Sequence, residues 1–541
     1  MSTDEEAFDI VVVGSGGGGL VGAYVAASRG LRTLLIEKTS LFGGTTSYSG
    51  AGIWFPGSAP LERAGITDGV DGSRAYLRSI VADDSRASRQ DAYLRAGAQL
   101  IDELEQNPWF QSFVYAPVPE YFAGHPGFSP AGHTIFPPDV AISDLGELGP
   151  LVRRSIPEER WGEPEGPALC GGRALIGRAV KAFVETGNGF YRLDTALTGL
   201  LVENDRIIGV QAVSKGEPVT IRARRGVLLA AGGFEHNAEL REKYGVVPPA
   251  HEWSHGAPEN TGDALLAGVA VGAATELLDE AWHVPGLIQP DGRPVFFAGL
   301  RGGIWVNGEG RRFMNEIEPY DRAGHDMRRA HTSTDVEHSR VHWILDQRQL
   351  DRDSFGGDPA APVRPEWFDS GALRKADTLE ELAEITGVPV ANLRETVREF
   401  NSYAPGGVDE QFHRGETPWD QMYQHVVGFS AVPGTPESGT TLNYLVPITG
   451  EWPNPLVQPI EQGPFYVATI VLSDIGTKGG LRTDENARVL REDGRPIEGL
   501  YATGNTMAAM SGGVYPGAGT PIGSSLAFAY LAVLDIVNGG K

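Results

Sequence analysis

Two largely apolar runs near the start of the chain predict buried strands. Residues 8–13 read Phe-Asp-Ile-Val-Val-Val, and residues 32–36 end in three aliphatic side chains. Between them, residues 20–27 are apolar over about two helical turns, which favours a helix packed inside the protein. The order of strand, helix and strand predicts the start of an α/β fold.

A glycine cluster joins the first predicted strand to the helix. It consists of Gly14, Ser15, Gly16, Gly17, Gly18 and Gly19, and Glu37 follows the second strand, 23 positions after Gly14. Glycines here permit a tight turn, a close approach to a pyrophosphate and helix–strand packing, and the acid suits a pair of ribose hydroxyls. The pattern predicts a dinucleotide site. Glu37 argues against NADP, but the pattern does not separate NAD from FAD.

Further segments favour FAD. A small, hydroxyl-rich loop follows the acid and resembles the loop that wraps the ribityl chain and flavin edge in FAD-dependent oxidoreductases; it offers Lys38, Thr39, Gly43, Gly44, Thr45, Thr46 and Ser47. Residues 226–235 resemble the strand beneath the cofactor, and residues 499–505 resemble a late strand and turn that supports it. On this resemblance we also assign to the cofactor Ala231, Gly232, Gly262, Asp263, Gly504, Asn505 and Leu526. Many relatives carry an acid at the place of Asn505, whose amide can make a similar bond.

A glycine-rich turn near the C-terminus places a phenol close to a predicted helix start. Tyr515 precedes Gly519 by four residues, and Pro521 introduces an apolar stretch that reads as a helix. A tyrosine hydroxyl and a glycine N–H that converge there could both donate to one carbonyl oxygen, as in an oxyanion hole. Taken alone, the same residues also fit an ordinary glycine-rich turn with a buried tyrosine.

The positions of the cofactor motifs predict the domain organisation. They lie in residues 8–60, 195–265 and 465–541, so we expect a discontinuous, Rossmann-like FAD-binding domain of residues 1–281 and 460–541. Residues 282–459 then form an inserted α+β catalytic domain that caps the substrate. Thr378 and Glu381 match a capping box at a helix start within it. Residues 112–150, rich in proline, glycine and aromatic residues, are expected to form an excursion over the substrate site.

Composition excludes several classes of function. The net charge of −25 gives no basic footprint for nucleic acid or anionic lipid. The single cysteine, Cys170, fits a reducing compartment and is expected to be a small buried residue. The twelve histidines show no metal-ligand spacing, so no metal is expected.

We expect a cytoplasmic protein. The N-terminus is acidic where a secretory signal would be basic. No apolar run approaches the ~18 residues needed to cross a bilayer, and residues 526–537, interrupted by Asp535, are expected to be a core helix. A loose association with a membrane through an apolar substrate entrance stays open.

With these motifs together, the chain resembles the 3-ketosteroid Δ1-dehydrogenases, which belong to the fumarate reductase-like flavoproteins. The resemblance covers nearly the full length. It rests on Tyr515-Pro-Gly-Ala-Gly519-Thr-Pro, on Pro-Tyr320-Asp, on Pro-Glu-Tyr121-Phe and on residues 474–480, Asp-Ile-Gly-Thr-Lys-Gly-Gly. The span between Tyr320 and Tyr515 looks longer than in typical members, which leaves the substrate range open.

The resemblance implies FAD as the cofactor and a 3-ketosteroid as the substrate. It implies that Tyr515 and Gly519 hold the C3 carbonyl oxygen, that Tyr320 removes the C2 proton with help from Tyr121, and that hydride leaves C1 for the flavin. An external acceptor, a quinone or another oxidant, then takes the electrons. A phenol with an ordinary pKa near 10 is a poor base unless its surroundings stabilise the phenolate.

Three other functions stay open at this point. A 3-ketosteroid 5α-Δ4-dehydrogenase shares substrate class and cofactor, although its late turn differs. A fumarate reductase-like enzyme needs paired arginines and a histidine at the flavin, for which Arg301, Arg311, Arg312 and His125 are candidates. A flavin- or steroid-binding protein without turnover is the third, and three tyrosines at the family's catalytic positions argue against it.

Overall fold

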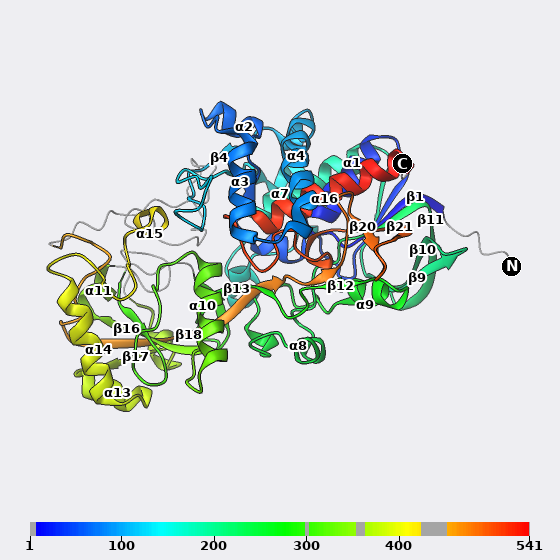
Figure 1. Ribbon diagram of the computed structural model, residues 1–541. Helices are drawn as coiled ribbons and strands as arrows, with labels where there is room; N and C mark the ends of the chain where they lie inside the picture. The colour runs from blue at the N-terminus through cyan, green and yellow to red at the C-terminus, as the bar shows by residue number, and fades with distance from the viewer. Residues whose placement is uncertain (1–6, 298–301, 353–362, 423–451, 540–541) are drawn as a thin grey trace.

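The first lobe of the molecule is built on an eight-stranded sheet. The computed structural model describes residues 7–297, 302–352, 363–422 and 452–539. The strand order is β20-β21-β10-β11-β1-β2-β8, with β9 paired to β10 (Figure 1). The strands are β1 Ala7–Val13, β2 Thr33–Ile36, β8 Gly189–Arg192, β9 Thr195–Glu203, β10 Arg206–Ser214, β11 Glu217–Leu229, β20 Arg488–Leu490 and β21 Pro496–Ala502.

Parallel pairing at the centre of this sheet brings the predicted cofactor segments together. β1 runs parallel to β2 and β11, and β21 runs parallel to β11. The carboxyl ends of these strands therefore meet at one edge of the sheet, where open α/β sheets bind ligands. The loops that follow them begin at Gly14, Glu37, Ala230 and Thr503. The structure confirms the α/β prediction for this part of the chain.

Helices α1 Gly17–Ser28 and α16 Thr520–Val537 pack against each other over this sheet (Figure 1). A Cβ at Gly18 would lie 2.2 Å from Ser525 Oγ, and one at Gly22 would lie 3.2 Å from Ala529 Cβ. The glycines of the fingerprint therefore also set the distance between the two helices.

α16 begins where Pro521 predicted it, but its apolar stretch is longer than the predicted run of residues 526–537. Its 18 residues have a mean hydropathy of 1.5, so by length and composition the helix could cross a membrane, but 72% of it is buried inside the protein. Its apolar residues pack in the core of the first lobe, as expected of a core helix.

The second lobe is a six-stranded sheet with helices on it. Its order is β14-β13-β18-β16-β15, with β17 paired to β18. These strands are β13 Ala281–Ile288, β14 Pro294–Phe296, β15 Ile304–Val306, β16 Arg340–Asp346, β17 Leu373–Ala376 and β18 Phe465–Thr477. β18 lies in this sheet although the predicted boundary at 459/460 assigns it to the first lobe. Its pairing favours a boundary after Thr477, and the division into two domains stays a prediction.

Helices α10 Tyr320–Ser333, α13 Leu379–Thr386 and α14 Val390–Tyr403 belong to the second lobe, which lies at the end of the molecule away from both termini (Figure 1). Thr378 caps α13 as predicted, since its hydroxyl accepts from Glu381 N–H at 3.2 Å. The Glu381 carboxylate accepts from Asp377 N–H rather than from Thr378, so the capping box is incomplete.

The remaining elements connect and cover the two sheets. The helices are α2 Ala59–Arg63, α3 Gly69–Val81, α4 Ala87–Leu104, α5 Ile142–Leu145, α6 Ile156–Trp161, α7 Gly171–Glu185, α8 Ala238–Tyr244, α9 Asp263–Ala270, α11 Gln347–Arg352, α12 Pro365–Asp369 and α15 Pro418–Met422. The short strands are β3 Ile53–Trp54, β4 Val114–Tyr115, β5 Thr134–Phe136, β6 Val140–Ala141, β7 Ala168–Leu169, β12 Thr275–Glu276 and β19 Gly480–Leu481. Cys170, expected to be buried, is exposed at the start of α7.

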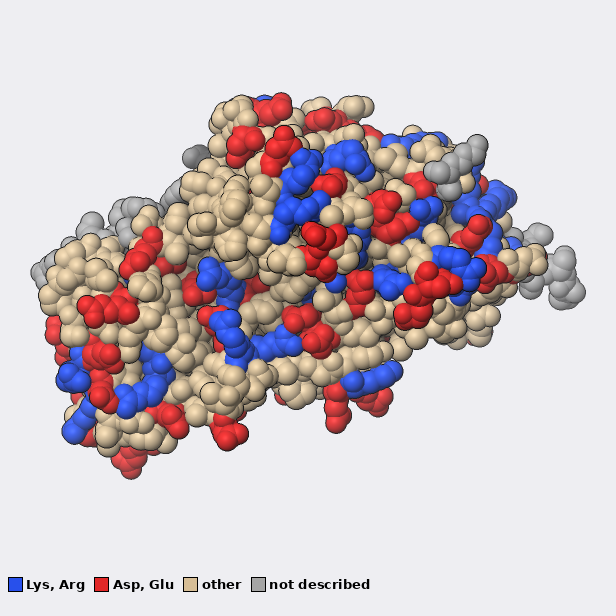
Figure 2. All heavy atoms as spheres, in the orientation of Figure 1, with Lys and Arg blue, Asp and Glu red and all other residues tan. Residues whose placement is uncertain are grey.

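Acidic and basic side chains are interspersed on the face shown in Figure 2. This distribution agrees with the net negative charge and gives no basic stripe on that face.

A buried histidine anchors the segment that carries Tyr121. His133 Nδ1 lies 2.7 Å from Glu120 Oε1, and its Nε2 lies 3.0 Å from Asp68 Oδ2. Burial alone would lower the pKa of His133, but the hydrogen bonds and negative charges of Glu120 and Asp68 outweigh it and raise that pKa above its ordinary value. The imidazole ring therefore ties Glu120, which precedes Tyr121, to Asp68 at the start of α3.

We predict that Gly18→Ala destabilises the protein. The added methyl would overlap Ser525 and push α1 from α16, which should lower the apparent melting temperature by several degrees, since overpacking costs about 1–3 kcal/mol. Gly72→Ala is the control. It lies in α3 with no atom within 4 Å of the added methyl, and should be neutral or slightly stabilising. Equal melting temperatures for Gly18→Ala and the wild type would contradict this account.

We also predict a pH-dependent role for His133. Because its folded pKa is raised, its stabilisation is fully present below the unfolded pKa of about 6.5 and is lost as pH rises through the folded pKa. The wild type should therefore have a higher melting temperature than His133→Gln, and the difference should be largest at about pH 6 and smallest at about pH 9. A constant difference across this range would refute the charge assignment.

Candidate active site and cofactor cavity

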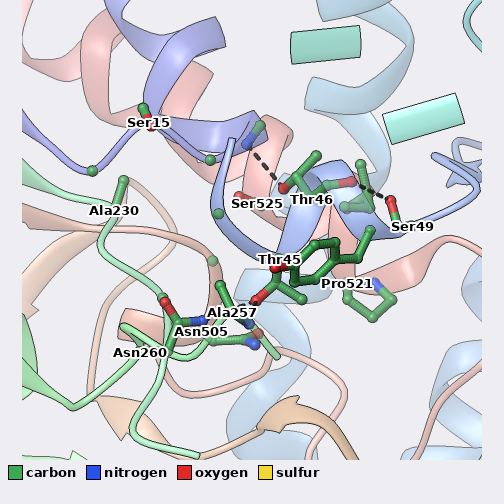
Figure 3. A pocket seen from close by; sticks show the side chains of 18 of the residues that line it. Ser15, Thr45, Thr46, Ser49, Ala230, Ala257, Asn260, Asn505, Pro521 and Ser525 are labelled. Atoms are coloured by element: carbon green, nitrogen blue, oxygen red, sulfur yellow. Dashed lines mark hydrogen bonds between the residues drawn. The ribbon is translucent and has the colours of Figure 1, made fainter. Parts of the chain in front are cut away.

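A cavity of about 310 Å³ opens at the sheet edge where the parallel strands end (Figure 3). It extends from the glycine cluster at the start of α1 to the tyrosines near α16 and α10. Most of the predicted site residues line it: Gly14, Ser15, Gly16, Gly17, Glu37, Lys38, Thr39, Gly44, Thr45, Thr46, Ala231, Gly232, Asp263, Gly504, Asn505, Tyr320, Tyr515 and Gly519.

The turn between β1 and α1 suits a pyrophosphate. Gly14 has a φ of +98°, and a Cβ there would lie 2.4 Å from Ala230 O, so a side chain is excluded. Gly16 and Gly17 leave the first turn of α1 open to the cavity, and this turn holds no acidic residue. A helix N-terminus with bare backbone N–H groups is an anion site.

Glu37 connects the turn to the loop after β2. Its Oε2 accepts from Ser15 N–H at 3.0 Å and from Ser15 Oγ at 2.7 Å. Its Oε1 accepts from Thr39 N–H at 2.9 Å. The carboxylate lines the cavity from a fixed position, where a ribose would meet it.

The hydroxyl-rich loop forms the 3₁₀ helix η1, Gly44–Tyr48. It is hydrogen-bonded to residues 257–260, which the sequence did not assign to the site. Thr45 Oγ1 accepts from Ala257 N–H at 2.8 Å and from Asn260 Nδ2 at 2.9 Å (Figure 3). Lys38 Nζ donates to Asp263 Oδ2 at 2.8 Å. These bonds close the cavity between the two loops.

Several predicted residues support the cavity without lining it. Gly18 and Gly19 pack against Ser525 and the Gly14 carbonyl, and Gly43 N–H donates to Ser15 Oγ at 3.0 Å. None of the following is among the lining residues: Gly18, Gly19, Gly43, Ser47, Gly262, Leu526 and Tyr121. Their assignment to the cofactor or substrate site stays a prediction.

The sequence analysis missed other lining residues. They include Phe136, Arg153, His255, Ala257, Asn260 and Ile475. The run of small and polar residues around Asn260, directly before the predicted Gly262 and Asp263, was the available signal. Phe136 and Ile475 carry no pattern that separates them from core residues.

Tyr515 lies at the meeting point of three catalytic candidates. Its hydroxyl accepts from Tyr320 Oη at 3.1 Å and from Gly519 N–H at 3.3 Å. Burial raises the pKa of Tyr515, although the bonds to Tyr320 and Gly519 lower it in part, so the phenol stays neutral and can donate at ordinary pH. The tyrosine hydroxyl and the glycine N–H thus point into one small volume.

Gly519 cannot be replaced without displacing the chain. Its φ is +95°, and a Cβ would lie 2.3 Å from the carbonyl carbon of Gly52. It is also the N-cap of α16, so the positive end of that helix points toward this position.

Tyr121 lies behind the other two tyrosines. Its ring centroid is 5.3 Å from that of Tyr320 and 5.2 Å from that of Tyr515. The Trp419 ring meets the Tyr121 ring edge-on, with the two centroids 4.9 Å apart. Tyr121 therefore packs against both Tyr320 and Tyr515, and its part in catalysis stays a prediction.

The residues considered for dicarboxylate binding do not gather at this cavity. Arg311 and Arg312 are paired with acidic residues of the second lobe, and His125 lies exposed beside Ser79. Arg301 lies outside the described residues. Of three large aromatic side chains in the described residues, Phe296 lines the cavity, whereas Trp54 and Trp305 are core.

The spacing of histidines in the sequence did not predict one polar cluster of the structure. Glu280, His283 and His325 bring ligand-type atoms within 4.8 Å of one another. The Glu280 carboxylate is already bonded to Arg328 and lies 3.3 Å from His325, and two cationic side chains border the group. This charge disfavours a metal ion there, and we propose none.

Comparison with known proteins agrees with this geometry. Residues 9–522 match the family model described as "FAD binding domain". The chain is 38% identical to the 3-oxosteroid 1-dehydrogenase of Mycobacterium tuberculosis, over 98% of each chain. It is 32% identical to the 4-oxocyclohexanecarboxylate 2-dehydrogenase of Sinomonas cyclohexanicum, over 98% of this chain and 93% of that one.

A solved structure gives the same result. The 3-ketosteroid Δ1-dehydrogenase of Sterolibacterium denitrificans, solved with 1,4-androstadiene-3,17-dione, has a TM-score of 0.87 and 30% identity, covering 98% of this chain and 100% of that chain. The chain therefore belongs to the FAD-binding flavoproteins and, within them, to the 3-oxosteroid 1-dehydrogenase family.

Proposed function

We propose that this protein uses FAD to introduce a double bond between C1 and C2 of a 3-oxosteroid. The observation that carries the proposal is the convergence of the Tyr515 hydroxyl and the Gly519 N–H, 3.3 Å apart, beside Tyr320 in a cavity that continues to the cofactor turn. The identity to 3-oxosteroid 1-dehydrogenases supports the same substrate class.

The chain's own groups can bind and polarise the ketone. The Tyr515 hydroxyl and the Gly519 N–H donate to the C3 oxygen. The ketone oxygen thereby replaces Tyr515 Oη as the acceptor of the Gly519 N–H bond. Donors fixed before the reaction stabilise enolate character without reorganising, an effect worth about 2.7–4 kcal/mol for one donor. The N-terminus of α16 adds positive potential at the same point.

Tyr320 is proposed as the base that takes the C2 proton. It lines the cavity, lies in the first turn of α10 and is hydrogen-bonded to Tyr515. Tyr121 packs edge-on against it and holds its ring. Proton removal at C2 makes C1 able to release its hydrogen with the bonding electron pair, and the C1–C2 double bond forms from the electrons left by the C2 proton.

Bound FAD supplies the two-electron acceptor for the hydrogen from C1. The residues that would hold it are the turn Gly14–Gly17, Glu37, Thr45, Thr46, Gly504 and Asn505, all on the cavity. Apolar walls such as Phe296 exclude water from the same space.

The neighbouring activities have less support. A 3-ketosteroid-Δ4-(5α)-dehydrogenase shares the fold, with a TM-score of 0.67 but 21% identity. A flavocytochrome c3 fumarate reductase also shares the fold, at 21% identity, and Arg311 and Arg312, considered for its chemistry, are paired with acidic residues and do not line this cavity.

The electron acceptor is proposed to be an external oxidant such as a quinone, since oxidation of the steroid leaves two electrons on the enzyme. We place the enzyme in the cytoplasm. The burial of α16 and the exposed thiol of Cys170 support this placement.

The first test is anaerobic mixing of the purified yellow protein with androst-4-ene-3,17-dione. We expect the flavin absorbance to bleach and the 1,4-diene to form. Bleaching only with a 5α-saturated 3-ketosteroid, with the 4-ene as product, would move the assignment to Δ4 oxidation. No bleaching with either steroid would overturn the steroid assignment.

Tyr320→Phe should abolish proton removal while leaving the ring packing intact. We expect the rate of bleaching to fall by at least about 100-fold, with little change in steroid affinity, because general bases contribute about 10²–10⁴-fold. Rapid-mixing spectroscopy measures the rate, and steroid-induced shifts of the flavin spectrum measure binding. A variant that keeps the wild-type rate would exclude Tyr320 as the base.

Gly519→Ala should damage the oxyanion hole. The new methyl would overlap Gly52 and displace the N–H, so turnover should fall by about 10²-fold or more. Gly72→Ala, whose added methyl would meet no atom within 4 Å, should retain wild-type turnover and serves as the control for the substitution type. Full activity of Gly519→Ala would show that its N–H is not needed.

A further inference from the structure

Lys478 is a buried cation with no role in the mechanism above. It directly follows β18 and belongs to the motif of residues 474–480, and its side chain is inaccessible to solvent. Its Nζ donates to the Gly513 carbonyl at 2.9 Å and lies 3.4 Å from Asp321 Oδ1. Burying an ammonium group is costly unless it is paired, so these contacts require an explanation.

Both partners of Lys478 adjoin catalytic tyrosines. Asp321 is the residue after Tyr320 and shares the first turn of α10 with it. Gly513 lies two residues before Tyr515 in the glycine-rich turn. One ammonium group therefore joins the two segments whose tyrosine hydroxyls lie 3.1 Å apart.

A third contact links Lys478 to the cofactor side of the site. Its Nζ lies 4.5 Å from the centroid of the Trp282 ring, within the range of a cation–π interaction. That ring meets Tyr515 edge-on at 5.1 Å, and its Nε1 donates to Asn505 Oδ1 at 3.0 Å. Lys478 thus contacts two residues that lie next to the tyrosines in sequence and one ring that packs on Tyr515.

The charges around Lys478 are arranged about Asp321. The carboxylate of Asp321 raises the pKa of Tyr515, after the larger effect of burial, and so opposes negative charge on the tyrosines. Lys478 faces Asp321 from the β18 side. Glu280 in the turn before β13, His283 in β13 and Arg328 in α10 complete the charged group around Lys478. His325 of α10 lies beside Asp321, with its Nδ1 3.2 Å from Asp321 Oδ2. Burial would lower the pKa of His325, but the negative charge of Asp321 outweighs it and raises that pKa to about 9.

We propose that Lys478 is a positioning residue for the dehydrogenation. It fixes the separation of the Tyr320 and Tyr515 segments, and together with His325 it balances the carboxylate of Asp321, so that negative charge can develop on the tyrosine pair. The inference rests on the proposed function, in which Tyr320 is the base.

The test compares the pH dependence of flavin bleaching by androst-4-ene-3,17-dione in four variants. In Lys478→Met the maximal rate should fall by about 10–100-fold, and the apparent pKa of the rising limb should increase by about one unit or more, because Asp321 loses one of the two cationic groups beside it and keeps only His325. Asp321→Asn should move that pKa in the opposite direction. The double variant should return it close to the wild-type value, and Lys478→Arg, which keeps the charge, should leave it there even if the rate falls.

Lys181→Met is the matched control. Lys181 also pairs with an acid, Glu185 at 3.2 Å, and lies over a tryptophan ring, Trp109 at 5.6 Å, but it belongs to α7 away from the tyrosines. Both its rate and its pH profile should match the wild type.

A purely structural role for Lys478 would lower the rate of Lys478→Met without moving the pKa, and the double variant would then be no better than the single one. Either result overturns the proposal. If Lys478→Met does not retain FAD, Asp321→Asn and Lys478→Arg test the proposal instead. An apparent pKa in Asp321→Asn equal to that of the wild type would then overturn it. Failure of the wild type to bleach would instead refute the proposed function.

Discussion

The close contact between α1 and α16 is the constraint on which the site depends. The start of α1 carries the turn for the cofactor, and the start of α16 carries Gly519. Because Gly18 lets the helices meet at Ser525, the distance from the pyrophosphate turn to the oxyanion donors is set by backbone packing rather than by flexible side chains. Tyr515 and Tyr320 then need only small adjustments to meet a ligand that lies between the two helix ends.

Much of the first lobe could be predicted from the sequence. The run at residues 8–13, the glycines after it and Glu37 report on local requirements, namely a buried strand, a tight turn and a ribose partner, and these requirements leave a pattern in neighbouring residues. The turn around Tyr515 and Gly519 was recognisable for the same reason, since its positive φ and helix start demand glycine and favour proline. Tyr121 and Tyr320 required the family resemblance, because an isolated tyrosine looks the same in a core and in an active site.

Other features could not be predicted because they depend on distant pairing. β18 joins the second sheet through β13 and β16, which no local pattern of residues 465–477 reveals. His255 and Asn260 reach the cavity only after the chain folds back on η1. The buried group around Glu280 and His325 likewise combines a turn and a helix that are far apart in sequence.

The position of β18 also limits how the two lobes can move. Asp474, near its end, is almost fully buried and forms an ion pair at 2.7 Å with Arg241 of the first lobe, whose side chain is also buried. A hinge motion that separated the lobes here would expose or orphan these charges, at a cost of about 3–5 kcal/mol for a broken buried pair. β18 and this ion pair therefore resist separation of the two lobes. We expect a bulky ligand to enter by local rearrangement of side chains and loops, with the two lobes held in place.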